Sequence, residues 1–378
     1  MPDFGKYRNY SLLLRINFSK HYKPAVSMTE ASVNSKKNKK TGKIILIGGI
    51  FISVCVLYFV YILFAPNISP VGDQKAYLCI PDSSSFDDVV ALLNKQAKVT
   101  NTAAFKQVSG LLKYKKIRPG RYELRRGMSN FQLVRTLRSG RQTPVKLTFN
   151  NIRTKEQLAG RLSTQLMADS ASIVALMNDS AFLSTYNLTP NTSISLFIPD
   201  TYEVFWDLDA KEVFERMKKE HDAFWTAERK AKADSIPLTP VEVSTLASIV
   251  EEETNGKAER PMVAGLYINR LKKDMPLQAD PTLKFAVGDF SIKRLTIEHI
   301  LKISPYNTYR NKGLPPGPIR VASPNGIDAV LNYKKHNYIF MCAKETLNGE
   351  HNFAVNYAEH QANARKYQKA LDARKIFK

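Results

Sequence analysis

Cysteine is scarce in this sequence, which has three cysteines in 378 residues. There is no Cys-x-x-Cys spacing and no cluster of cysteine with histidine, so the sequence predicts no metal site. Cys55 lies in an apolar run, and nothing in the positions of Cys79 and Cys342 supports or excludes a disulfide between them. The chain also has no internal repeat and no low-complexity tract.

Acidic residues are also few: 34 stand against 56 basic residues, and the net charge is +22. Such a charge would usually indicate a nucleic-acid partner, so its position matters. Residues 1–43 carry ten basic and two acidic residues, a net of +8, and the remaining +14 is spread over the long segment that follows. A length of 378 residues with 44% hydrophobic side chains predicts two folded units plus appendages.

Charge is missing altogether from Ile44 to Ala65, a run of 22 residues. A helix of that length crosses the hydrocarbon core of a membrane, about 30 Å thick. A signal peptide would have a shorter apolar core, and Pro66 makes a poor cleavage junction, so we expect an uncleaved transmembrane helix over residues 44–65. Lysines precede the run, which predicts a cytoplasmic basic tail at residues 1–43, an exported remainder, membrane lipid as a partner and no nucleic acid. Met28 opens a more ordinary leader and is a second candidate for the true start.

The exported part is expected to begin with a polar linker at residues 66–75 and a small α+β module at residues 76–147. Strand-like runs alternate there with helical ones, and Ser-x-x-Asp and Ser-x-x-Gln patterns at Ser85 and Ser129 predict two capped helix starts. The order strand, helix, helix, strand resembles LysM-like modules, which hold glycans that contain N-acetylglucosamine.

A larger, mixed and largely helical unit is expected over residues 148–378, which makes the fold class α+β. Helical periodicity is clear at residues 155–167 and 210–229. Tyr338–Ala343 is an apolar run of six residues and a strand candidate.

One predicted helix of this unit carries three consecutive glutamates. Thr239-Pro-Val-Glu242 is a capping box with proline at the first helical position, and the helix should run to about Thr254. Its periodicity places Glu252 in solvent and Glu251 and Glu253 beside the buried stripe. Small neighbours leave room for a ligand at Glu251, which makes it a candidate acid, whereas the alternative is that all three glutamates form a solvated charge run.

Five short blocks in and after this helix carry more specific information. In order, they are Ala247–Thr254, Tyr267–Leu271, Leu277–Thr282, Ser304–Tyr309 and Gly313–Ile319, with further matches at Phe197–Glu203, His351–Phe353 and Glu359–His360. They closely resemble the endolytic murein transglycosylases, the MltG or YceG-like family. The resemblance covers about residues 150–375, and the anchor and LysM-like module ahead of it fit the layout of that family.

The resemblance implies an enzyme of the bacterial plasma (inner) membrane, a lytic transglycosylase with a YceG-like catalytic domain. Such an enzyme cleaves the MurNAc–GlcNAc bond within nascent peptidoglycan strands, leaves 1,6-anhydro-MurNAc ends and terminates glycan elongation. Its catalytic glutamate is the first after an Ile-Val pair, which is Glu251 here, and Glu253 matches a second glutamate of the motif. Glycan strands and membrane peptidoglycan synthases are the expected partners, with no cofactor and no metal.

Residues for positioning the substrate are expected in the blocks that follow. Gln278 and Asn307 offer amides and Tyr306 and Tyr309 offer aromatic faces, although turn architecture is an equally good explanation of each. Asp280 is the nearby carboxylate that would distinguish a hydrolytic muramidase.

Three further expectations concern alternatives and departures. A non-catalytic peptidoglycan-binding scaffold is the alternative from another class of protein. His351 and His360 have no metal-ligand context and are expected to be structural. Ser193–Leu196 stands where the family has a Glu-Gly pair, so glycan contacts of that pair are not carried over.

Overall fold

The computed structural model describes residues 30–72, 75–292, 294–374 and 376, with residues 30–40 described as backbone only. Most of the predicted tail and the start candidate Met28 lie outside the described residues. The chain divides into two compact units, and the boundary between them in the sequence falls after Leu63.

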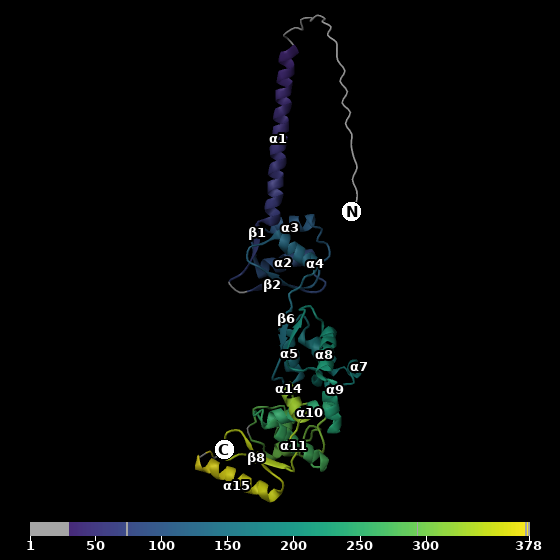
Figure 1. The fold of residues 1–378 in the computed structure, drawn as a ribbon, viewed down its shortest axis with the longest axis vertical. Coiled ribbons are helices and arrows are strands. Elements are labelled where there is room, and N and C mark those ends of the chain that lie inside the picture. Colours follow the sequence, from purple (N-terminus) through teal and green to yellow (C-terminus); the bar gives the residue numbers. More distant parts are fainter. Residues whose placement is uncertain (1–29, 73–74, 293, 375, 377–378) are drawn as a thin grey trace, which may run out of the picture. The chain divides into compact units, whose positions relative to one another are not determined.

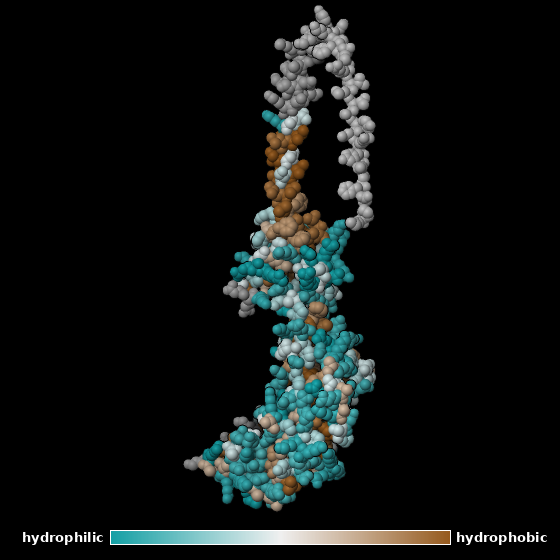
Figure 2. Space-filling model, in the orientation of Figure 1, coloured by the Kyte–Doolittle hydropathy of each residue, from teal (hydrophilic) through white to brown (hydrophobic). Residues whose placement is uncertain are grey.

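The long helix α1, Glu30–Phe64, belongs to the first unit up to Leu63 (Figure 1). Its part from Thr41 to Phe64 is 24 residues long and has a mean hydropathy of 2.6. Figure 2 shows the apolar side chains that cover this part of the helix. Within the described residues, it is the one helix long and apolar enough to cross a membrane, which agrees with the apolar run seen at residues 44–65.

The second unit begins with a small α+β module. Antiparallel pairing joins β1 to β3 and β5 in one sheet, and β2 to β4 in another. Both predicted capping boxes are present, at Ser85 and Ser129, so both helix starts are confirmed. The elements of the module are β1 (Pro66–Pro70), β2 (Ala76–Ile80), α2 (Phe86–Gln96), β3 (Ala97–Val99), α3 (Thr102–Leu111), β4 (Gly120–Leu124), β5 (Met128–Ser129) and α4 (Asn130–Ser139) (Figure 1).

The expected linker at residues 66–75 is wrong in its first half, which is strand β1. Ile68 of that strand is fully buried and lies opposite Val99 of β3. The Pro, Asn and Ser content of this segment is typical of a linker. It forms a strand nevertheless, because strand pairing uses backbone groups and the buried Ile68 anchors the segment in the module. The likeness of the module to LysM stays a prediction.

The larger domain starts at β6, a few residues before the expected boundary at residue 148. Strand β6 pairs antiparallel with β7, and Leu147 belongs to the first of two core clusters of this domain. The predicted helix over 155–167 ends at Ser163, and the one over 210–229 is interrupted at Trp225 and Thr226. The elements of this first half are β6 (Val145–Thr148), α5 (Lys155–Ser163), α6 (Ser170–Asn178), α7 (Ser180–Ser184), the 3-10 helix η1 (Ser193–Leu196), β7 (Thr201–Val204) and α8 (Ala210–Phe224).

The second core cluster gathers around α10 and carries the rest of the domain. The predicted strand at residues 338–343 is confirmed in position, because β8 pairs with β9. Cys79 and Cys342 are both free. The remaining elements are α9 (Ala227–Ser235), α10 (Pro240–Glu253), α11 (Arg260–Lys272), α12 (Asp280–Val287), α13 (Ile297–Leu301), α14 (Pro324–Leu331), β8 (Phe340–Ala343), β9 (His351–Ala354) and α15 (Tyr357–Ala373) (Figure 1).

Candidate active site

Helix α10 positions the three glutamates. Thr239 accepts a hydrogen bond from the backbone of Glu242, whose side chain bonds back to the cap, so the predicted capping box is confirmed. The inward face is buried as predicted, with Val243, Leu246 and Val250 fully covered. The glutamates therefore lie in the last turn of a helix that the core holds on several sides.

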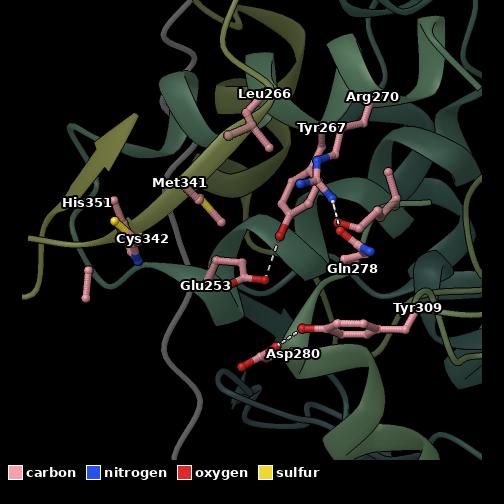
Figure 3. Close-up of a pocket in the computed structure, with 12 residues that line it drawn as sticks. Glu253, Leu266, Tyr267, Arg270, Gln278, Asp280, Tyr309, Met341, Cys342 and His351 are labelled. Atoms are coloured by element: carbon pink, nitrogen blue, oxygen red, sulfur yellow. Dashed lines mark hydrogen bonds between the residues drawn. The ribbon is translucent and has the colours of Figure 1, made fainter. Parts of the chain in front are cut away.

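A pocket of about 210 Å³ opens beside the end of α10 (Figure 3). Its walls come from α10, α11, the segment at the start of α12, the loop that contains Tyr309, and the β8–β9 hairpin. Glu253 is the glutamate of α10 that lines it. The lining residues are Glu253, Leu266, Tyr267, Arg270, Leu277, Gln278, Asp280, Tyr309, Met341, Cys342, Ala343 and His351.

Glu253 has the protonation behaviour that an acid catalyst needs. Burial raises the pKa of this carboxyl to about 7, and Asp280 adds to the effect. The Tyr267 hydroxyl donates a 2.6 Å hydrogen bond to Glu253 Oε1, which acts against that rise by stabilising the carboxylate. A glutamate with a pKa near neutrality can both give and take a proton at physiological pH.

Arg270 organises one wall of the pocket. Its guanidinium donates to the backbone carbonyls of Pro276, Leu277 and Ile339, which ties the segment before α12 to the start of β8. It also donates to Oε1 of Gln278 at 3.0 Å. This bond fixes the orientation of the Gln278 amide, whose nitrogen is a donor that can meet a ligand.

Asp280 and Tyr309 form a second polar pair in the pocket (Figure 3). The Tyr309 hydroxyl donates to Asp280 Oδ1. Burial, followed by this hydrogen bond, raises the pKa of Tyr309. Gln278, Asp280 and Tyr309 therefore lie together with Glu253, as expected for residues of one site.

Asn307 and Tyr306 lie elsewhere. Asn307 is fully buried, and its amide donates to the carbonyls of Ile300 and Lys302, which is the turn architecture that was the alternative to substrate binding. Tyr306 lines a separate cavity of about 340 Å³ together with Phe285, and the centroids of the two rings are 4.7 Å apart.

Glu251 is engaged in a different environment and is not among the residues that line the Glu253 pocket. Its side chain is 3% exposed and pairs with Arg260, whose Nη1 lies 2.9 Å from Oε1. Ser323, the cap of α14, donates its backbone N–H and its hydroxyl to the two carboxylate oxygens. A Cβ on Gly326 would lie 2.6 Å from the Glu251 carboxyl carbon, so protein atoms close this site.

Glu252 does not point into solvent, which corrects the expectation from helix periodicity. Its side chain is 15% exposed and makes ion pairs with Arg153 and Arg320. Arg153 comes from the segment before α5, about one hundred residues earlier in the chain. Sequence periodicity cannot register such a partner, because the partner covers the outer face of the helix only after the two halves of the domain have met.

Three residues of the pocket were not predicted from the sequence as functional candidates: Tyr267, Arg270 and His351. Tyr267 and Arg270 belong to a block quoted for the family resemblance, but nothing local marks them as facing a ligand. His351, expected to be structural, lines the pocket, and its Nδ1 lies 3.0 Å from Glu259 Oε2. Ser193–Leu196, which departs from the family pattern, is buried as η1.

Comparison with protein families adds a match that covers most of the chain. The model of the YceG-like family matches residues 78–366. A yceG-like protein from Listeria monocytogenes has a similar fold, with a TM-score of 0.52 and 27% identity, over 76% of this chain and 98% of that protein.

Two curated relatives are both named endolytic murein transglycosylase. The one from Bacillus subtilis is 29% identical over 308 residues, which are 76% of this chain and 83% of the relative. The one from Streptococcus pneumoniae strain R6 is 26% identical over 345 residues, which are 81% of this chain and 61% of the relative. This chain therefore spans about three fifths of the streptococcal protein.

Proposed function

Because the chain belongs to the YceG-like family, we propose that it is a lytic transglycosylase that cleaves the MurNAc–GlcNAc bond within peptidoglycan strands and leaves 1,6-anhydro-MurNAc ends. The curated relatives named endolytic murein transglycosylase support the reaction class. The observation that carries the proposal in this chain is Glu253, a glutamate with a pKa of about 7 inside a polar pocket.

Glu253 performs the acid step in this proposal. Its protonated carboxyl donates to the glycosidic oxygen as the bond to C1 of MurNAc breaks through an oxocarbenium-like state. The C6 hydroxyl of the same sugar then attacks C1, and its proton returns to Glu253, which restores the acid. One titrating carboxyl is sufficient, because the nucleophile is part of the substrate and its effective concentration is high.

Glu251, the glutamate singled out by the family motif, has a supporting role in this proposal. Its two carboxylate oxygens are occupied by Arg260 and Ser323, so it holds α10, α11 and the start of α14 together. A carboxyl group whose two oxygens are both held by protein donors is poorly placed to reach a glycan. The two assignments predict opposite results for substitutions at positions 251 and 253.

The cellular part of the proposal rests on helix α1. Thr41–Phe64 serves as a single membrane anchor with the basic N-terminal tail in the cytoplasm, so that the catalytic domain acts on nascent strands outside the plasma membrane. Cleavage there terminates glycan elongation, and the synthases that extrude the strands are the proposed partners.

A hydrolytic muramidase is the second candidate, and Asp280 is the observation that favours it. A hydrolase needs a second carboxyl to activate water or to form a covalent intermediate, and Asp280 lines the same pocket as Glu253. The Tyr309 hydroxyl donates a hydrogen bond to Asp280, which makes this carboxylate less available to activate water. We therefore favour the transglycosylase over the hydrolase.

The deciding experiment is mass spectrometry of the products that full-length protein in detergent releases from purified, uncrosslinked glycan strands. We expect anhydro-MurNAc ends from the wild type and none from Glu253→Gln. Reducing MurNAc ends from the wild type would establish hydrolysis and direct attention to Asp280. Binding of strands with no cleavage, by wild type and variant alike, would support a peptidoglycan-binding scaffold.

A further inference from the structure

We propose that His351 is a second catalytic residue, which carries the proton of the substrate's C6 hydroxyl back to Glu253. This inference rests on the proposed transglycosylase function and adds a group to it. It starts from a contact outside the α10 glutamates, the pairing of His351 with Glu259.

The β8–β9 hairpin aims His351 toward the pocket. In its antiparallel register Met341 lies opposite Phe353, and Ala343 lies opposite His351. Side chains two residues apart on a strand share a face, so His351 points the same way as Phe353. Since Met341 and Phe353 pack against the second core cluster, His351 faces inward too. Figure 3 shows His351 and Met341 on the hairpin side of the pocket that contains Glu253.

Glu259 fixes the chemistry of the imidazole. The backbone N–H of His351 donates to Glu259 Oε1 at 2.7 Å, and the ring nitrogen Nδ1 lies 3.0 Å from Oε2. A carboxylate accepts, so Nδ1 carries a proton in this contact, which makes Nε2 the nitrogen whose lone pair can act as a base. Among the residues that the structure describes, none forms a hydrogen bond with Nε2. Both side chains are mostly buried, at 16% and 13% exposed, which holds this geometry.

In this proposal His351 accepts the proton of the C6 hydroxyl at the stage when Glu253 is still protonated and cannot accept it. The O6–H bond breaks toward Nε2, O6 bonds to C1, and the C1–O4 bond breaks as O4 takes the proton of Glu253. The imidazolium then transfers its proton to the Glu253 carboxylate. Both groups return to their starting states, and no further reactant is needed. Glu259 stabilises the transient positive charge on the ring.

His351→Gln tests the relay, because glutamine can accept a hydrogen bond but cannot take a proton. The backbone bond from residue 351 to Glu259 survives this substitution. We expect turnover to fall on the order of 100-fold, the usual contribution of a general base. We also expect reducing MurNAc ends among the products, since water competes for the oxocarbenium-like state once the C6 hydroxyl is less nucleophilic.

The product ratio separates this role from a structural one. His360→Gln is the matched control, because His360 stacks on Phe340 of the same hairpin and does not line the pocket. We expect it to leave the ratio of anhydro to reducing ends unchanged. If His351→Gln gives the same ratio of anhydro to reducing ends as the wild type, the proposed proton transfer through His351 is wrong. This holds whether the turnover of the variant is unchanged or falls in proportion to its folded fraction. A wild type without anhydro ends would refute the proposed function itself.

Discussion

Paired substitutions at Glu251 and Glu253 decide which of the two glutamates is the acid. Glu251→Gln removes the counter-ion of Arg260, whose side chain is 10% exposed. Breaking a buried pair from one side costs about 3 kcal/mol or more. In a domain of this size that lowers Tm by about 6–12 °C. Glu253→Gln loses no ion pair and keeps an acceptor for the Tyr267 hydroxyl, so at pH 4.5, where Glu253 of the folded wild type is still protonated, we expect its Tm to remain within about 2 °C of the wild type.

Activity should follow the opposite order. Without its acid, Glu253→Gln should lose roughly 100-fold or more in turnover. Glu251→Gln should retain activity in proportion to its folded fraction, measured at a temperature well below its Tm. The assays are differential scanning fluorimetry and quantitative mass spectrometry of released muropeptides, with the exposed Glu228→Gln as the matched control. A stable but inactive Glu251→Gln beside an active Glu253→Gln would refute the assignment and restore the prediction from the family motif.

Three other outcomes follow from the same contacts. Turnover should fall as pH rises through about 7, where Glu253 loses its proton. The pKa of Glu253 in the folded protein lies above the ordinary 4.5, so the free energy of unfolding should also fall between pH 4.5 and 7. A plot of Tm against pH should therefore be flatter for Glu253→Gln than for the wild type. Tyr267→Phe removes a hydrogen bond that lowers the pKa of Glu253, so the alkaline limb of the pH–rate profile should move upward. Asn307→Ala removes the donor of two partly buried hydrogen bonds, to the carbonyls of Ile300 and Lys302, which should cost about 1–2 kcal/mol in urea unfolding while the folded enzyme keeps its product ratio.

Local patterns in the sequence were sufficient to predict helix α10 and several residues of the pocket. The capping box at Thr239 set the start of α10, and its apolar spacing identified the buried face, because both depend on residues within four positions of each other. The five blocks indicated the family for a similar reason: they are short, contiguous and ordered. Gln278, Asp280 and Tyr309 came from those blocks and lie in one pocket.

Which glutamate faces that pocket was decided only by tertiary structure. Glu251, Glu252 and Glu253 are neighbours in sequence, yet one pairs with Arg260 and Ser323, one with Arg153 and Arg320, and one lines the pocket with Tyr267. The sequence determined that α10 ends in three carboxylates beside a buried face. Their partners come from α11, the segment that leads into α14 and the segment before α5. A carboxyl group's burial and pKa depend on such partners, so the chemical role of each glutamate was fixed only when these distant segments packed around the helix.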